Sequence, residues 1–172
     1  VFRHVKDHQK TLLPMFGGLI FMALIFYSFT FWAPTMMIRT YGISLSEVGF
    51  ILGIITIVSS ITGTILAGSA VDFLRNRNYS DAPVRAAMIA VLLALPPVVL
   101  LSFVQSEFAA WACIALYLLF ISSFAPLGLL AISGVSAGHV KGQLAAVHAF
   151  LMMAFGLSLG PQITAFFTDF VL

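Results

Sequence analysis

Charged side chains are scarce in this sequence of 172 residues: 8% are Asp, Glu, Lys or Arg, whereas 61% are hydrophobic. Soluble globular domains carry about 25% charged and about 45–50% apolar residues. A soluble domain of this length could not bury so much apolar surface, because a large share of a small domain is surface. The composition therefore excludes a soluble globular domain and indicates a protein whose surroundings are lipid.

Cysteine and metal-binding patterns are equally sparse. Cys113 is the single cysteine, so the chain forms no internal disulfide, and its place in an apolar run predicts a packing role. His4, Asp7 and His8 could supply metal ligands from one face of a helix, but no further ligand follows at motif spacing. We therefore expect no metal and no cofactor, and an enzyme is a remote alternative. The net charge of +2 is too small to predict a nucleic-acid partner.

Long apolar runs are what the sequence has in abundance. Five runs free of Lys, Arg, Asp and Glu are each close to the length of about 20 residues that spans a bilayer. They cover about residues 12–38, 48–71, 86–104, 108–133 and 143–168. Their length and lack of strict alternation exclude barrel strands. We predict an all-α, polytopic membrane bundle of five transmembrane helices, preceded by a linker at residues 1–11.

The basic residues are distributed unequally between the two ends of these spans. One side carries Arg3, Lys6, Lys10, Arg75, Arg77, Arg85 and Lys141, and the other carries Arg39 alone. Because cytoplasmic loops are enriched in Lys and Arg, we expect a cytoplasmic N-terminus. The odd number of spans predicts that the chain is a piece of a longer protein.

Small residues mark places where helices could approach closely. Gly49, Gly53, Gly63 and Gly68 fall on the second span, and Gly156 and Gly160 on the fifth, just before Pro161. Small residues allow close contact between helix backbones in lipid. These glycines fit both static packing and the flexible helices of a gate.

The most informative motif follows the second span, where Gly68, Asp72, Arg75 and Arg77 are closely spaced. A carboxylate at a helix end can accept hydrogen bonds from the N-terminus of a neighbouring helix, where the dipole favours negative charge. The arginines could pair with Asp72 or with lipid headgroups. The alternative is a plain basic loop with one incidental aspartate.

This motif resembles the loop signature of the major facilitator superfamily. It departs from that signature at Phe73, where a basic residue is usual, and at Arg75, where glycine is usual. The stretches 31–49 and 138–161 are similar to other passages of the family, with Lys141 in place of the more usual arginine. The resemblance implies helices seven to eleven of a transporter, the C-terminal half, nearest to the spinster-like and organic-anion branches.

The same resemblance implies alternating access between two halves, with substrate held near the midplane. Asp72 would then contact the start of a helix in the other half, and Lys141 with Gly142 would receive the matching aspartate. Polar and aromatic residues on the spans are candidates for the cavity wall, each with packing as the alternative. They are Tyr27, Phe31, Trp32, Thr56, Ser59, Tyr117, Ser122 and His148.

His148 differs from the other candidates because, apart from Tyr and Cys, it is the one ionisable group within a predicted span. Such residues are functional candidates in membranes, so it could relay a proton or contact an anionic headgroup. A neutral, hydrogen-bonded histidine is the alternative.

The expected partners are a small-molecule substrate, membrane lipids and the other half of the transporter. The apolar, aromatic lining suggests an amphipathic, lipid-like substrate, and the resemblance to the organic-anion branch implies a small organic anion as the other possibility. The spans contain no carboxylate, so coupling to protons or Na+ would have to come from elsewhere. A receptor or assembly subunit that does not transport is the alternative function.

Overall fold

The structure, a computed structural model, describes residues 9–135 and 138–170, and every element in these ranges is helical. The all-α prediction is therefore confirmed. The long elements are α2 (Gln9–Tyr41), α3 (Leu45–Asn76), α4 (Ala82–Leu101), α5 (Glu107–Ile121) and α6 (Phe124–Val135). They are followed by η1 (Gly138–Val140), α7 (Lys141–Leu151), the π-helical η2 (Met152–Leu157) and α8 (Ser158–Phe170).

Five helical segments in the described part of the chain are long and apolar enough to cross a membrane. They are Leu12–Tyr41, Leu45–Asn76, Ala82–Leu101, Glu107–Gly134 and Lys141–Phe166. Each contains most of one predicted span, so the predicted number of spans is confirmed. The third begins four residues before its predicted start at Ala86, because Pro83 suits the first turn of a helix, where its missing N–H is not needed.

Two of the segments contain an irregularity that their apolar runs do not predict. The fourth is divided between α5 and α6, since Pro126 has no N–H to offer the carbonyl of Ser122. The fifth contains the π-helical turn η2 shortly before Pro161, which removes another helical hydrogen bond. Hydropathy is continuous through both places, so the runs alone gave no sign of them.

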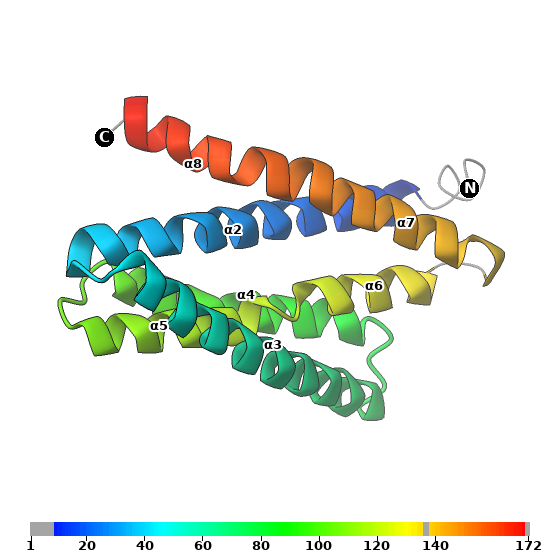
Figure 1. The fold of residues 1–172 in the computed structure, drawn as a ribbon. Helices are drawn as coiled ribbons and strands as arrows, with labels where there is room; N and C mark the ends of the chain where they lie inside the picture. The colour runs from blue at the N-terminus through cyan, green and yellow to red at the C-terminus, as the bar shows by residue number, and fades with distance from the viewer. Residues whose placement is uncertain (1–8, 136–137, 171–172) are drawn as a thin grey trace. The chain divides into compact units, whose positions relative to one another are not determined.

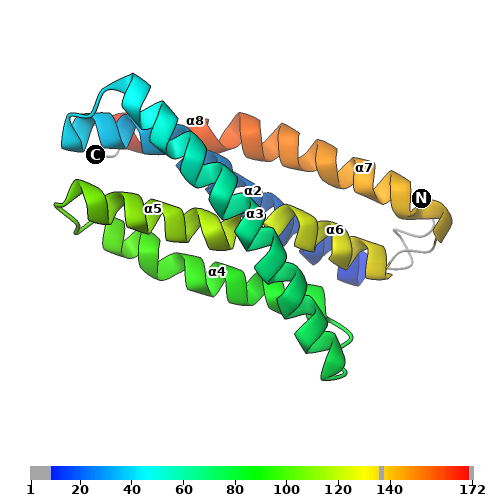
Figure 2. The same ribbon diagram turned by 60° about the horizontal axis from the view of Figure 1, so that its bottom comes forward.

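The chain divides into two compact units. The terminal unit consists of Val1–Ala33 and Leu129–Leu172, and the central unit of Pro34–Gly128. In the terminal unit, α7 and α8 run alongside α2 (Figure 1). In the central unit, α3, α4 and α5 pack against one another (Figure 2).

Local signals explain the ends of α3 and α4 in the central unit. Ser44 caps α3 by accepting a hydrogen bond from the N–H of Glu47 at 3.3 Å, a pairing typical of the Ser-x-x-Glu pattern. After α3, Asn78 adopts a left-handed conformation with φ of 63°, which asparagine tolerates better than most residues. The chain then turns directly into α4.

Candidate functional site

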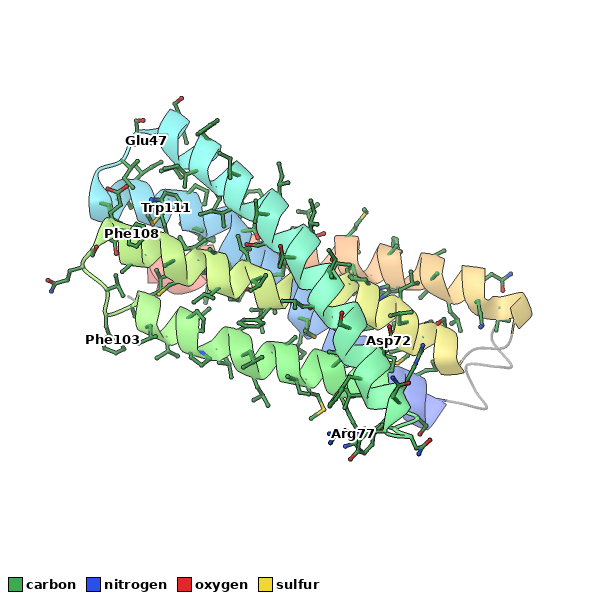
Figure 3. All side chains as sticks on the ribbon, turned by 90° about the horizontal axis from the view of Figure 1, so that it is seen from below. Glu47, Asp72, Arg77, Phe103, Phe108 and Trp111 are labelled. Carbon is green, nitrogen blue, oxygen red and sulfur yellow. The ribbon has the colours of Figure 1, made fainter. Side chains whose placement is uncertain are left out.

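The predicted gate motif lies at one end of the central unit. Figure 3 shows Asp72 and Arg77 at this end, and Glu47, Phe103 and Trp111 at the opposite end. The side chains of Asp72, Arg75 and Arg77 are all exposed, and Arg77 is the C-cap residue of α3. Gly68 is half-buried, and a Cβ placed there would meet no atom within 4 Å. The motif therefore presents its charges outward.

The charges at this end are organised by the turn between α3 and α4. Arg85 donates its Nε–H to both carboxylate oxygens of Asp81, at 2.8 and 3.0 Å, and lies 4.4 Å from the ring centroid of Tyr79. This hydrogen bond lowers the pKa of the Asp81 carboxyl. Among the residues whose side chains the structure describes, this is the one ion pair within 4.0 Å, so Asp72 pairs with neither neighbouring arginine. Arg77 instead stacks over the ring of Phe73, at 4.6 Å.

The opposite end of the central unit is rich in aromatic residues. Tyr41 donates its hydroxyl hydrogen to the carbonyl of Val104 at 2.8 Å, which ties the α2–α3 turn to the α4–α5 turn. Trp111 donates its indole N–H to Glu107 at 3.3 Å. Phe103 and Phe108 are exposed. Aromatic side chains gather at membrane–water interfaces, so this end has the character of an interfacial belt.

Two of the predicted cavity residues meet in the contact between α3 and α5. Ser59 is buried and donates its hydroxyl hydrogen to the carbonyl of Ala115 at 3.2 Å. The hydroxyl of Ser122 is 3.5 Å from the carbonyl of Ser59. Tyr117 is also buried, and Thr56 is half-buried. The serines therefore form hydrogen-bonding contacts between α3 and α5, and a role in a cavity wall stays a prediction for both.

Ser59→Ala should lower the free energy of unfolding by about 0.6 kcal/mol, the average for hydrogen bonds between membrane helices. The serine hydroxyl is lost while the helix backbone is unchanged. Ser69→Ala is the matched control, because Ser69 is exposed and bonds to Ile65 in its own helix. Unfolding of the purified protein in mixed micelles measures both variants. Equal values for the two would contradict a role for Ser59 in holding α3 to α5.

In the terminal unit, α2 meets the fifth span at Gly156, at Gly160 and through one hydrogen bond. A Cβ on Gly156 would lie 2.7 Å from the Cβ of Ala23 and 2.8 Å from the ring of Tyr27. Trp32 donates its indole N–H to the carbonyl of Pro161 at 3.2 Å. Tyr27 and Trp32 are thus half-buried at this contact, whereas Phe31 is exposed.

The remaining predicted residues of the terminal unit lie on α7. Lys141 and Gly142 form its exposed first turn, and His148 is buried, with 6% of its surface accessible. His148 lies one turn before the π-helical η2, which is a common location of functional residues in helices. The cavity candidates therefore divide between the two units, and their shared role stays a prediction.

The metal hypothesis concerns residues beyond those described, since His4, Asp7 and His8 all lie outside the structure's described ranges. Among the residues that are described, no three His, Cys, Asp or Glu side chains gather as metal ligands.

The five apolar segments, together with their charged and aromatic ends, define a polytopic integral membrane protein. Two known proteins with similar sequences are both named as transporters. The chain is 27% identical to an MFS-type efflux pump of Mycolicibacterium smegmatis over 164 residues, 94% of the chain and 37% of that protein. It is 30% identical to the uncharacterized transporter YybO of Bacillus subtilis over 108 residues, 59% of the chain and 25% of that protein.

The chain therefore spans between a quarter and about two fifths of the length of these two relatives. No protein-family model matches the chain, and no solved structure does. The names of both relatives indicate transport across a membrane, and that of the first supports membership in the major facilitator superfamily.

Proposed function

We propose that this chain is the C-terminal half, helices seven to eleven, of a major facilitator transporter that moves a solute by alternating access. The observation that carries the proposal is the alignment of 94% of the chain with an MFS-type efflux pump. Five membrane-length helices and the exposed Asp72 motif at the end of α3 support it. The basic end of the central unit then faces the cytoplasm of a bacterial cell, following the distribution of Lys and Arg.

The gate in this proposal consists of Asp72 and the first turn of α7. Asp72 is exposed and forms no ion pair with Arg75 or Arg77, so its carboxylate is available to a helix of the other half. Lys141 and Gly142 are exposed too and would receive an aspartate in return. A hydrogen bond to a charged group contributes about 1.5–3 kcal/mol. Such contacts would hold the cytoplasmic side closed and would break when the protein opens inward.

Asp72→Asn in the full-length protein should shift the balance between the two states toward inward-facing by about tenfold or more, because loss of the charge removes most of that contribution. Transport into or out of proteoliposomes and labelling of cysteines on each side measure the change. Glu47→Gln is the matched control, since Glu47 is an exposed carboxylate at the opposite end of the central unit.

Two results would count against the proposal in different ways. Unchanged transport and accessibility in Asp72→Asn would reject the gate and leave the transporter standing. Absence of any solute flux through the intact protein, with ligand binding retained, would instead favour a receptor or assembly subunit.

The substrate class in this proposal is a small organic anion or an amphipathic, lipid-like molecule. The candidate wall residues of the terminal unit are aromatic, with Phe31 exposed and Tyr27 and Trp32 half-buried. The first relative's name favours export as the direction. His148 is the candidate for a proton relay, because it is an ionisable residue buried within a span.

A further inference from the structure

A groove with a volume of about 230 Å³ lies in the central unit, between α3, α4 and α5. Its walls are mostly small and apolar, with Gly63, Ala67 and Ala70 on α3, Ala86 and Ala90 on α4, and Phe120 on α5. All of these residues belong to membrane-length segments, so the surroundings of the groove are hydrocarbon. Its apolar lining fits a flexible hydrocarbon chain.

Helical spacing leads from this groove to two arginines. Arg77 follows Ala70 by seven residues, with Leu74 between them, and Arg85 precedes Ile89, another wall residue, by four. Residues separated by four and seven positions share one face of a helix. Arg85 therefore continues the line of wall residues on α4. Arg77, the C-cap residue directly after α3, follows the line on α3, at the end of the central unit where Figure 3 shows it.

The two arginines retain the capacity to bind an anion. Arg85 uses its Nε–H for Asp81, and a guanidinium has four more N–H donors. Arg77 lies over the face of Phe73, a contact that does not consume the N–H groups in its plane. Two arginines against the one carboxylate of Asp81 leave a single positive charge, which matches the charge of a phosphodiester.

We propose that the central unit binds an anionic phospholipid, with one acyl chain in the groove and the phosphate held between Arg77 and Arg85. Helical spacing places the positive pair beyond one end of the apolar groove, in the order of headgroup and tail in one lipid. Membrane lipid is also the solvent of these helices, so the ligand is present wherever the protein is.

Native mass spectrometry of the full-length protein tests the proposal, with phosphatidylglycerol and phosphatidylcholine of identical acyl chains as probes. The wild-type protein should retain phosphatidylglycerol preferentially. Arg77→Gln and Arg85→Gln should each weaken its retention about fivefold, the usual effect of one basic residue on anionic lipid. Arg75→Gln is the matched control, because it removes the same charge two residues before Arg77, on a different face of α3 from the wall residues. It should change retention less than twofold.

A second pair of variants tests the groove. Ala90→Phe fills it and should lower retention of both lipids, whereas Met88→Phe, on an exposed part of α4 outside the groove, should not. A phosphatidylglycerol with a photoreactive group in its acyl chain needs no variant and should label residues 63–70 or 86–93. Equal retention of the two lipids by the wild type, or labelling confined to other segments, would overturn the proposal and indicate that another helix or bulk lipid covers the groove.

Discussion

Gly63→Ala should destabilise the protein by about 1–3 kcal/mol, the usual cost of forcing extra atoms into a packed contact. The added Cβ would collide with the backbone carbonyl oxygen of Leu119 and would lie 2.9 Å from the Oγ of Ser122. A backbone atom cannot move aside as a flexible side chain does, so α3 and α5 would have to separate. This separation would also weaken the hydrogen bonds of the Ser59 and Ser122 hydroxyls between the two helices.

Gly53→Ala on the same helix is the matched control, because a Cβ there meets no atom within 4 Å. Alanine is favoured over glycine in a helix by about 0.5–1 kcal/mol, so this variant should be neutral or stabilising. Reversible unfolding of the full-length protein in mixed micelles gives both free energies. Equal effects of the two substitutions would show that the contact at Gly63 does not hold α3 against α5.

The sequence predicted the helices well because their signal is additive. A membrane span needs only a long apolar run without charge, and each of the five runs meets this condition whatever its neighbours are. The close contact at one glycine is a different kind of property. Gly49, Gly53, Gly63 and Gly68 look alike in the sequence, yet only Gly63 among them has a near neighbour in the described part of the chain. Which glycine lies in the contact depends on how α3 is rotated about its axis relative to α5. The sequence of α3 alone does not determine that rotation.

The candidate site shows the same division. Asp72, Arg75 and Arg77 were predicted together because they lie within six residues of one helix end, so that any helix would group them. The hydrogen bonds from Tyr41 to Val104 and from Trp32 to Pro161 were missed, because a backbone carbonyl accepts equally well from any residue type. The π-helical turn was missed because its residues are as apolar as those of an α-helix.

The irregular fifth span contains two of these missed features, the π-helical turn and the hydrogen bond from Trp32 to Pro161. The π-helical η2 contains Gly156, and Pro161 lies five residues after Gly156. The fifth span therefore meets α2 where the helical hydrogen bonds of the fifth span are disturbed. Helices that gate transporters change shape at such places, since the backbone there has alternative hydrogen-bond partners. We therefore expect Gly156 and the Trp32–Pro161 hydrogen bond to act as one fixed contact that holds α2 against the fifth span.

Gly156→Ala should destabilise the protein by about 1–3 kcal/mol, and its effect should overlap with that of Trp32→Phe. The new Cβ would force α2 away at Ala23 and Tyr27, and this movement would lengthen the Trp32–Pro161 hydrogen bond. Trp32→Phe has less to remove once that bond is already broken. The double variant should therefore lose less stability than the sum of the single variants, by about 0.5 kcal/mol or more.

A double-mutant cycle of unfolding free energies measures this coupling, with Gly18→Ala in place of Gly156→Ala as the control. Gly18 is an exposed residue of α2 whose added Cβ would meet no atom within 4 Å, so its substitution should add to Trp32→Phe without coupling. Additivity in the Gly156 cycle as well would mean that the close approach and the hydrogen bond form independently. The fixed contact inferred for α2 and the fifth span would then have to be abandoned, because a rigid contact transmits a displacement from one end to the other.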